Sequence, residues 1–303
     1  MNRIESMQSV VSISGRIETR LLCLAFAQQW VIGVCRESDL RLPAGITEFS
    51  VLEPPIGVHY ADPFIIFRAG RSYVFFEVWR DDDSKGSIWV TALDAHRLWG
   101  CPEPVLERPY HLSYPFVFDW HDDLYMLPET QHNHTIELYR CVKFPRQWEL
   151  AGVLMDRVDA VDTTLFEQNG RWWMFAAGFG DTAARFRQLS VFYADSPFGP
   201  WRPHSRNPVV DDLSAARPAG RLFMHDGHLI RPGQDSRLRY GHSIAWNRVD
   251  ILNDGEYHET CIGRLKPRLL DGWLAAHTFN QAGDWQVLDG KRLVRRTAAN
   301  RAA

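Results

Sequence analysis

The sequence has 303 residues, of which 45% are hydrophobic and 23% are charged, and its formal net charge is −3. This composition is typical of a globular protein, and the near-neutral charge excludes a chain that relies on electrostatic attraction to nucleic acid or anionic membranes. No apolar run is long enough for a membrane span, and no signal peptide is recognisable. The five cysteines are odd in number and scattered, which predicts free thiols and a cytoplasmic location.

In chain order, residues 1–29 carry no periodic signal and are predicted to be a partly disordered lead. Residues 59–77 then read as a strand, a tight turn at Ala69-Gly70 and a returning strand. Asp62 begins the first of these strands and Glu77 ends the second. Because the two outer ends of an antiparallel hairpin lie at one edge, we expect both carboxylates to point toward the same place.

The same plan recurs further along the chain, at residues 114–129, 162–175, 217–232 and 277–289. The copies begin roughly 50 residues apart, a period typical of β-propeller blades. The turns are predicted at Asn169-Gly170 in the third copy and at Asp226-Gly227 in the fourth. The sequence therefore predicts an all-β, five-bladed β-propeller over residues 30–296, followed by a tail at 297–303.

The blades are expected to cover residues 59–98, 112–148, 161–201, 217–251 and 257–292. Residues 30–34 have the composition of a strand, and we expect them to close the ring by pairing with the C-terminal blade. The 12 tryptophans are explained first as packing between blades, and a few as platforms for a sugar ring.

The ordered motifs carry a family resemblance: HYADPFIIF, FFE, YPFVF, MLPET, DTTLF, GRWWMF, SPFGPW, RPAG, RPGQD and HTFN. Together they resemble the five-bladed propeller at the N-terminus of glucosamine inositolphosphorylceramide transferases, which is similar to the propellers of glycoside hydrolase family 43. The resemblance covers about residues 30–292 and implies a carbohydrate-active propeller. In the plant proteins, sugar transfer is ascribed to a separate domain.

Two functions follow as alternatives from the resemblance and the acids. The first is a glycoside-hydrolase-like enzyme that acts on a glycan or glycoconjugate. The second is a non-catalytic glycan-binding domain that assists a glycosyl- or formyltransferase encoded elsewhere. A third possibility, a propeller that only binds proteins, predicts no clustered acids at the mouth of the funnel.

The candidate catalytic residues are acids near the axis. The innermost strands of a propeller line its axial funnel, and ligands bind at one mouth. A glycosidase needs one carboxylate as base or nucleophile and one carboxyl group as acid. Resemblance to family 43 implies an Asp of the first blade as base, which Asp62 matches, whereas Tyr114 stands where the second Asp is expected. Glu77, Glu129 and Asp162 complete the catalytic candidates.

The candidate binding residues lie at the same strand starts. Arg217 either grips an anionic group of the substrate in a bidentate fork or pairs internally with Asp62 or Asp162. Asp235, His277 and Asn280 are expected to add polar contacts.

Trp79, Tyr114 and Trp173 are candidates for stacking on a sugar, or else they fill the core between blades. No cofactor motif is present, and the histidine pairs at 132/134 and 225/228 lack a third ligand, so we expect neither cofactor nor metal. The acidic turn at 81–86 is interpreted as solvated rather than calcium-binding.

Overall fold

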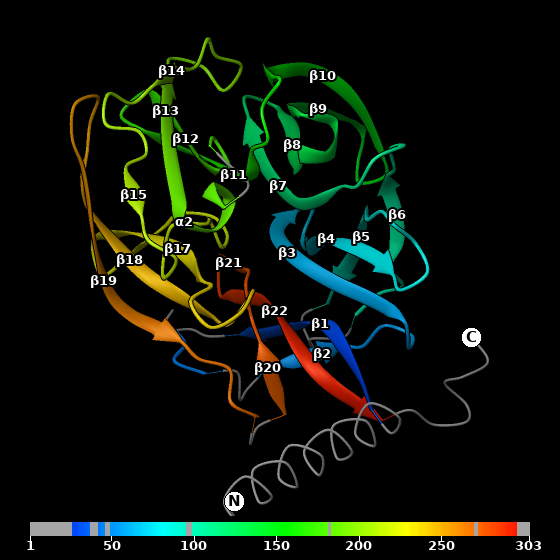
Figure 1. The fold of residues 1–303 in the computed structure, drawn as a ribbon. Helices are drawn as coiled ribbons and strands as arrows, with labels where there is room; N and C mark the ends of the chain where they lie inside the picture. Colours follow the sequence, from blue (N-terminus) through cyan, green and yellow to red (C-terminus); the bar gives the residue numbers. More distant parts are fainter. Residues whose placement is uncertain are drawn as a thin grey trace, which may run out of the picture.

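The computed structural model describes residues 26–36, 42–45, 49–94, 99–180, 183–269 and 272–295. Five antiparallel sheets of four or five strands surround a common axis (Figure 1). The predicted all-β, five-bladed propeller is therefore confirmed. The predicted tail and residues 1–25 of the predicted lead lie outside the described residues, but β1 begins at Phe26, so residues 26–29 belong to a strand rather than to the lead.

The first three blades follow one another along the chain, each running from the axis outward. Blade one consists of β3 (Val58–Arg68), β4 (Arg71–Arg80), β5 (Ser87–Leu93) and β6 (Glu103–Leu106). Blade two consists of β7 (Ser113–Trp120), β8 (Asp123–Glu129), β9 (Thr135–Lys143) and β10 (Gln147–Asp156). Blade three consists of β11 (Val161–Gln168), β12 (Arg171–Ala177), β13 (Gln188–Ala194), β14 (Arg202–Pro203) and β15 (Val210–Asp211).

Blade four extends further along the chain than the sequence predicted. It consists of β16 (Phe223–His225), β17 (His228–Asp235), β18 (Ser243–Leu252) and β19 (Tyr257–Leu265). The prediction that blade five begins at residue 257 was wrong, because β19 pairs with β18 along its whole length. The spacing of the repeats predicts the start of each inner hairpin, but it does not predict the blade to which an outer strand belongs.

Blade five is built from both ends of the described chain. It contains β20 (Trp273–Ala275), β21 (Phe279–Ala282), β22 (Trp285–Arg295), β1 (Phe26–Arg36) and β2 (Ser50–Leu52). β1 and β22 pair antiparallel without interruption from Phe26↔Arg295 to Arg36↔Trp285. The expected closing strand is thus confirmed, and it joins the two ends of the ring.

A β-bulge interrupts the inner strand of each of the first three blades at the same position. One extra residue lies in β3, β7 and β11, and Asp62, Tyr114 and Asp162 take left-handed φ angles of 51°, 44° and 53° there. Such a conformation costs a non-glycine residue roughly 1–2 kcal/mol, and bulges redirect side chains. The three equivalent residues are therefore held at the axis by a repeated local distortion.

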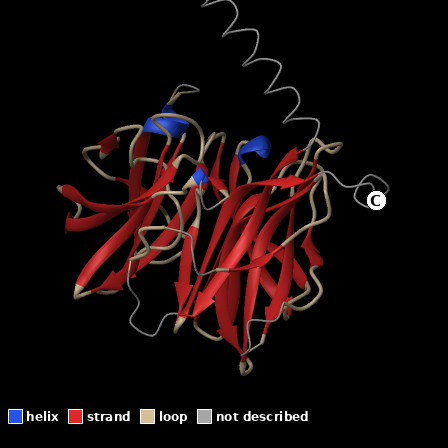
Figure 2. Cartoon of the chain, turned by 90° about the horizontal axis from the view of Figure 1, so that it is seen from below, coloured by secondary structure: helices blue, strands red, loops and turns tan. Residues whose placement is uncertain are grey.

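The helical elements are short. In the described part of the chain they are η1 (Gln131–Asn133) and α2 (Ala184–Arg187), and Figure 2 shows helical turns toward one end of the strands. Phe186 of α2 lies beside Arg217, so this end is the one that carries the axial residues described below. None of the described helices is long and apolar enough to cross a membrane.

The turn between β11 and β12 has the predicted geometry, with φ of 55° at Asn169 and 76° at Gly170. No atom lies within 4 Å of a Cβ built on Gly170, so a side chain there is opposed only by the backbone conformation. We expect Gly170→Val to lower the free energy of unfolding by about 1–2 kcal/mol in urea denaturation.

Gly152 of β10 is the matched control, because it also has open space around its Cβ but no positive φ. Gly152→Val is expected to change the free energy of unfolding much less. An equal loss in both variants would contradict the assignment of strain to φ.

Candidate functional site

A cavity of about 270 Å³ lies at the axial mouth of the propeller. Its carboxyl groups are those of Asp62, Glu77 and Glu129, which were predicted from the sequence, and that of Asp83. Its basic groups and its aromatic walls are provided by Lys85, His111, Arg217, His277, Trp30, Trp79 and Tyr240. These side chains come from blades one, two, four and five, so the cavity is a product of the closed ring and not of any single blade.

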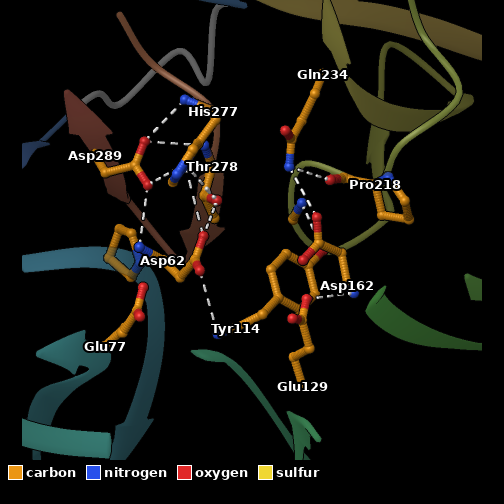
Figure 3. A network of polar contacts seen from close by, with 12 residues as sticks. Asp62, Glu77, Tyr114, Glu129, Asp162, Pro218, Gln234, His277, Thr278 and Asp289 are labelled. Atoms are coloured by element: carbon orange, nitrogen blue, oxygen red, sulfur yellow. Dashed lines mark hydrogen bonds and ion pairs between the residues drawn. The ribbon is translucent and has the colours of Figure 1, made fainter. Parts of the chain in front are cut away.

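Asp62 occupies a fixed position in the cavity wall. Its Oδ2 accepts a hydrogen bond from the backbone N–H of Tyr114 at 3.2 Å, and its Oδ1 accepts one from Thr278 Oγ1 at 2.5 Å. Its own N–H donates to Asp289 at 3.0 Å (Figure 3). Burial, opposed by the charge of His277 and reinforced by that of Glu77, raises the pKa of Asp62 to about 7.

His277 and Asp289 form a buried ion pair behind Asp62. Nδ1 of His277 lies 2.5 Å from Asp289 and 3.6 Å from Asp62. Asp289 also accepts the backbone N–H groups of residues 277 and 278. Burial alone would lower the pKa of His277, but the two carboxylates outweigh it and raise the pKa to about 9. The imidazolium therefore supports the negative charge of Asp62.

These three residues also form the group of possible metal ligands found among the described residues. One ligand atom from each of Asp62, His277 and Asp289 lies within 4.8 Å of the others. Nδ1 of His277 already contacts Asp289 at 2.5 Å, and a proton on that nitrogen competes with a metal ion. We describe the group as a hydrogen-bonded ion pair, and the absence of a metal stays a prediction.

Asp162 lies on the other side of Tyr114 from Asp62 (Figure 3) and forms a second polar cluster with Arg217. Nε and Nη2 of Arg217 donate to the two oxygens of Asp162 at 2.5 Å and 3.2 Å. Gln234 Nε2 adds a bond to Asp162 at 2.8 Å. Asp162 is buried and does not line the cavity, so the structure does not place it with the other catalytic candidates. The internal pairing of Arg217 considered from the sequence is the one found, and the fork is not free for a substrate.

Glu129 has a carboxyl group that is difficult to ionise. Its side chain is 10% exposed, and its Oε2 accepts the N–H of Asp162 at 3.3 Å. Arg217 Nη2 is 3.7 Å away, and that guanidinium is already engaged by Asp162. Burial and the nearby charge of Asp162 outweigh Arg217 and raise the pKa of Glu129 to about 8.

Glu77 faces His111, whose Nε2 lies 3.2 Å from its Oε1. The N–H of Gly86 donates to Nδ1 of His111 at 2.8 Å, which places the ring proton on Nε2, toward Glu77. Burial alone would lower the pKa of His111, but the hydrogen bond and charge of Glu77 raise it. Glu77 therefore has a titratable hydrogen-bond donor as its direct partner.

Tyr114 is not a stacking platform, and the alternative interpretation, that it fills the core between blades, is the one found. Its side chain is fully buried between the two polar clusters, where its hydroxyl meets Thr164 Oγ1 at 2.8 Å and accepts the N–H of Gly220 at 2.7 Å. Its ring packs edge-on against Phe64. Tyr114 thus fills the axis and separates the acids instead of touching a ligand.

Three further candidates lie outside the cavity. Trp173 packs in the core near Tyr193, as the alternative interpretation had it. Asp235 is held by Arg237 at 2.7 Å. Asn280 donates to the carbonyl of Pro63 and accepts the N–H of residue 221, which links blades one, four and five. Of the predicted binding residues, Trp79, Arg217 and His277 line the cavity.

Several cavity residues were missed. Trp30 stacks on His277 with ring centroids 4.3 Å apart, but it was interpreted only as part of the closing strand. His111 and Tyr240 lie in loops between strands, which carry no periodic signal. The acidic turn at 81–86, interpreted as merely solvated, provides residues 83–85 to the rim. The repeat pattern predicts where the inner strands lie, but it does not predict which loop residues line the cavity.

The pairing of Arg217 with Asp162 gives a stability prediction. Asp162→Asn leaves the buried guanidinium without its bidentate acceptor, so we expect a loss of about 3 kcal/mol or more in the free energy of unfolding. The surface pair Arg171–Asp254 is the control, and Asp254→Asn is expected to cost less than about 1 kcal/mol. Losses of similar size in urea denaturation would contradict the buried role of Asp162.

The raised pKa of Glu129 predicts how stability depends on pH. Between about pH 4.5 and 8 the folded state holds a proton that the unfolded chain releases, so this contribution is complete below pH 4.5 and is lost as the pH rises through 8. Glu129→Gln removes it. We expect the stability of this variant relative to the wild type to increase from pH 5 to 8, by at most about 1.4 kcal/mol per pH unit.

Chemical denaturation of both proteins across this pH range measures the effect. Glu107→Gln, at an exposed position, controls for the loss of one negative charge. A difference between Glu129→Gln and the wild type that does not change with pH would contradict the assignment.

Comparison with solved structures supports the architecture. An exo-β-1,3-galactanase from Clostridium thermocellum matches with a TM-score of 0.56 at 13% identity, over 67% of this chain and 49% of that chain. A family 117 glycoside hydrolase from Zobellia galactanivorans matches with a TM-score of 0.54 at 11% identity, over 87% and 90%. The α-L-arabinanase of Cellvibrio cellulosa, complexed with arabinohexaose, matches with a TM-score of 0.52 at 14% identity, over 67% and 77%. At these identities the likeness shows the fold alone.

Comparison of sequences gives the family. The glucosamine inositolphosphorylceramide transferase 1 of Oryza sativa subsp. japonica is 37% identical over 203 residues, which are 66% of this chain and 27% of the relative. The protein of the same name from Arabidopsis thaliana is 35% identical over 205 residues, 66% and 26%. The chain thus spans about a quarter of the length of these relatives. A family model described as glucosamine inositolphosphorylceramide transferase 1, N-terminal, matches residues 53–267, so the chain belongs to this family of propeller domains.

Proposed function

We propose that the axial cavity hydrolyses a glycosidic bond in a glycan or glycoconjugate. The observation that carries this proposal is the convergence of Asp62, Glu77 and Glu129 on one cavity. Hydrolysis of a glycoside requires two carboxyl groups in different protonation states on either side of the bond. Asp62 and Glu129 are the candidates for these two groups, and the likeness of the fold to those of glycoside hydrolases supports the proposal.

The environments of the carboxyl groups assign the roles. Glu129 is the proposed acid, because its raised pKa keeps a proton available for the leaving oxygen. Asp62 is the proposed base, because His277 and two hydrogen bonds favour its charged form against burial. A water molecule attacks the anomeric carbon and gives its proton to Asp62, while Glu129 protonates the departing sugar. Glu77, held by His111, orients the sugar in the cavity.

The walls suit the ring of a terminal sugar. Trp30 and Trp79 line the cavity, and indole faces pack against the C–H faces of pyranoses. Trp79 is itself fixed by stacking on His59, with an interplanar angle of 10°. The volume of about 270 Å³ is at the lower end for ligand pockets, which favours one sugar residue over an extended chain.

The second candidate is a glycan-binding domain without catalysis that serves a transferase. The name of the curated relatives, which is that of a transferase, favours it. The chain covers only 27% and 26% of those relatives. Their name describes the whole proteins, so a part in sugar transfer is only proposed for this chain. Retention of a glycan without turnover would support this candidate.

Hydrolysis can be tested with a panel of nitrophenyl glycosides and oligosaccharides. We expect Asp62→Asn to lower kcat by at least about a hundredfold, as for other general bases. The rate should be highest between about pH 7 and 8, because Asp62 is protonated below this range and Glu129 loses its proton above it. Kinetics over pH 5–10 measure both effects.

The surface variant Asp254→Asn serves as the control and should retain full activity. Glu129→Gln should lose less activity with nitrophenyl glycosides, whose leaving group needs little protonation, than with natural glycosides. Full activity of Asp62→Asn would remove this residue from the mechanism. Binding of a glycan with no turnover of any substrate would favour the second candidate.

A further inference from the structure

A second cavity, of about 550 Å³, lies between blades five and one, away from the axial mouth. Its walls come from the β3–β4 turn, the ends of β1 and β5, the start of β22, and the segment around Trp99. The bulge at Asp62 lies near the middle of β3, and the turn at Gly70 follows the end of this strand, eight residues further along the chain. With about 3.3 Å per residue, the strand separates them by roughly 20–25 Å. This groove is therefore independent of the axial cavity.

Aromatic side chains form one part of its wall. Phe67 is 68% exposed, although it follows the buried run of β3, and it lines the groove. Trp99 and Trp285 are partly buried, pack against the core between blades five and one, and also line the groove. Exposed or half-exposed rings around one hollow are a common way to bind the apolar face of a sugar.

Two guanidinium groups form another part. Arg36 lies 5.6 Å from the ring centroid of Trp285 and pairs with Asp284 at 3.1 Å. Arg71 is exposed and makes no side-chain hydrogen bond or ion pair within the described part of the chain. Asp94 is the lining acid among the described residues. The groove thus has two cations and one carboxylate, whereas four acids line the axial cavity.

We propose that this groove binds a sugar residue that carries an anionic substituent, either a carboxylate or a phosphate. The aromatic rings contact the C–H face of the sugar, and the free guanidinium of Arg71 donates two parallel hydrogen bonds to the anion. Arg36 adds positive charge while its contact with Trp285 fixes the aromatic wall. The ligand is held at a distance from the axial cavity, so the groove anchors an acidic glycan or glycoconjugate and takes no part in catalysis.

Three probes that share one ring test this inference by NMR titration of the full chain. They are methyl β-glucoside, methyl β-glucuronide and methyl β-glucoside 6-phosphate, which differ only at C6. We expect at least one of the two anionic probes to bind about tenfold more tightly than the neutral one. Which anionic probe binds better tells a carboxylate ligand from a phosphate ligand.

The variants decide where the probe binds. Arg71→Ala is expected to lower the affinity for the anionic probe to that for the glucoside. Arg68→Ala removes a cation from the same hairpin that pairs with Asp119 and does not line the groove, so it should leave the affinity unchanged. Asp62→Asn in the axial cavity should also leave it unchanged. Arg71 is exposed, so its replacement is not expected to disturb folding.

Three results would overturn the inference. They are equal affinity for neutral and anionic probes, an Arg71→Ala variant that binds like the wild type, and no binding of either anionic probe up to about 10 mM. None of these results bears on hydrolysis in the axial cavity, which is measured separately.

Discussion

The site depends on one backbone constraint, the left-handed residue at the bulge of each inner strand in blades one to three. Asp62, Tyr114 and Asp162 occupy this position, and an ordinary strand would alternate their side chains between the faces of the blade. The bulge instead holds all three near the axis, at a cost in conformational energy. Contacts across the axis offset that cost: each of the three receives or donates hydrogen bonds to a different blade. The bulges that shape the inner strands of the blades therefore also determine where the side chains of the site lie.

The acids near the axis repel one another when they are ionised, and only some of them have a close cationic partner. Asp162 and Asp289 have buried cationic partners, Arg217 and His277. Asp62 and Glu129 share those cations at longer distances, 3.6 Å and 3.7 Å, and their pKa values are raised. The two acids with a close cationic partner, Asp162 and Asp289, lie behind the cavity. The two acids that are further from a cation, Asp62 and Glu129, line it. This division separates supporting groups from groups that can exchange protons with a ligand.

The sequence predicted the architecture well, because the repeat pattern records a local property, an inner hairpin with an acid at its end. Asp62, Glu77 and Glu129 were found in this way. The same pattern placed Tyr114 near the axis but could not tell that its side chain is buried there, since a strand position does not fix the neighbours of a side chain. It also missed Asp289, whose partners Asp62 and His277 become neighbours only when the ring closes. Loop residues such as His111 and Tyr240 carry no periodicity and were not predictable.

The closing of blade five has a consequence for how the chain folds. Cys35 of β1 lies opposite Gln286 of β22, and these residues are 251 positions apart. During synthesis the residues of the other four blades are made between β1 and β22, so the backbone groups of β1 wait for β22 until those blades have emerged. Contacts of such sequence separation slow folding, because loop closure must be completed before they form. In the meantime an eleven-residue strand with a buried apolar face has an open edge, the kind of surface that aggregates unless another strand or a chaperone covers it.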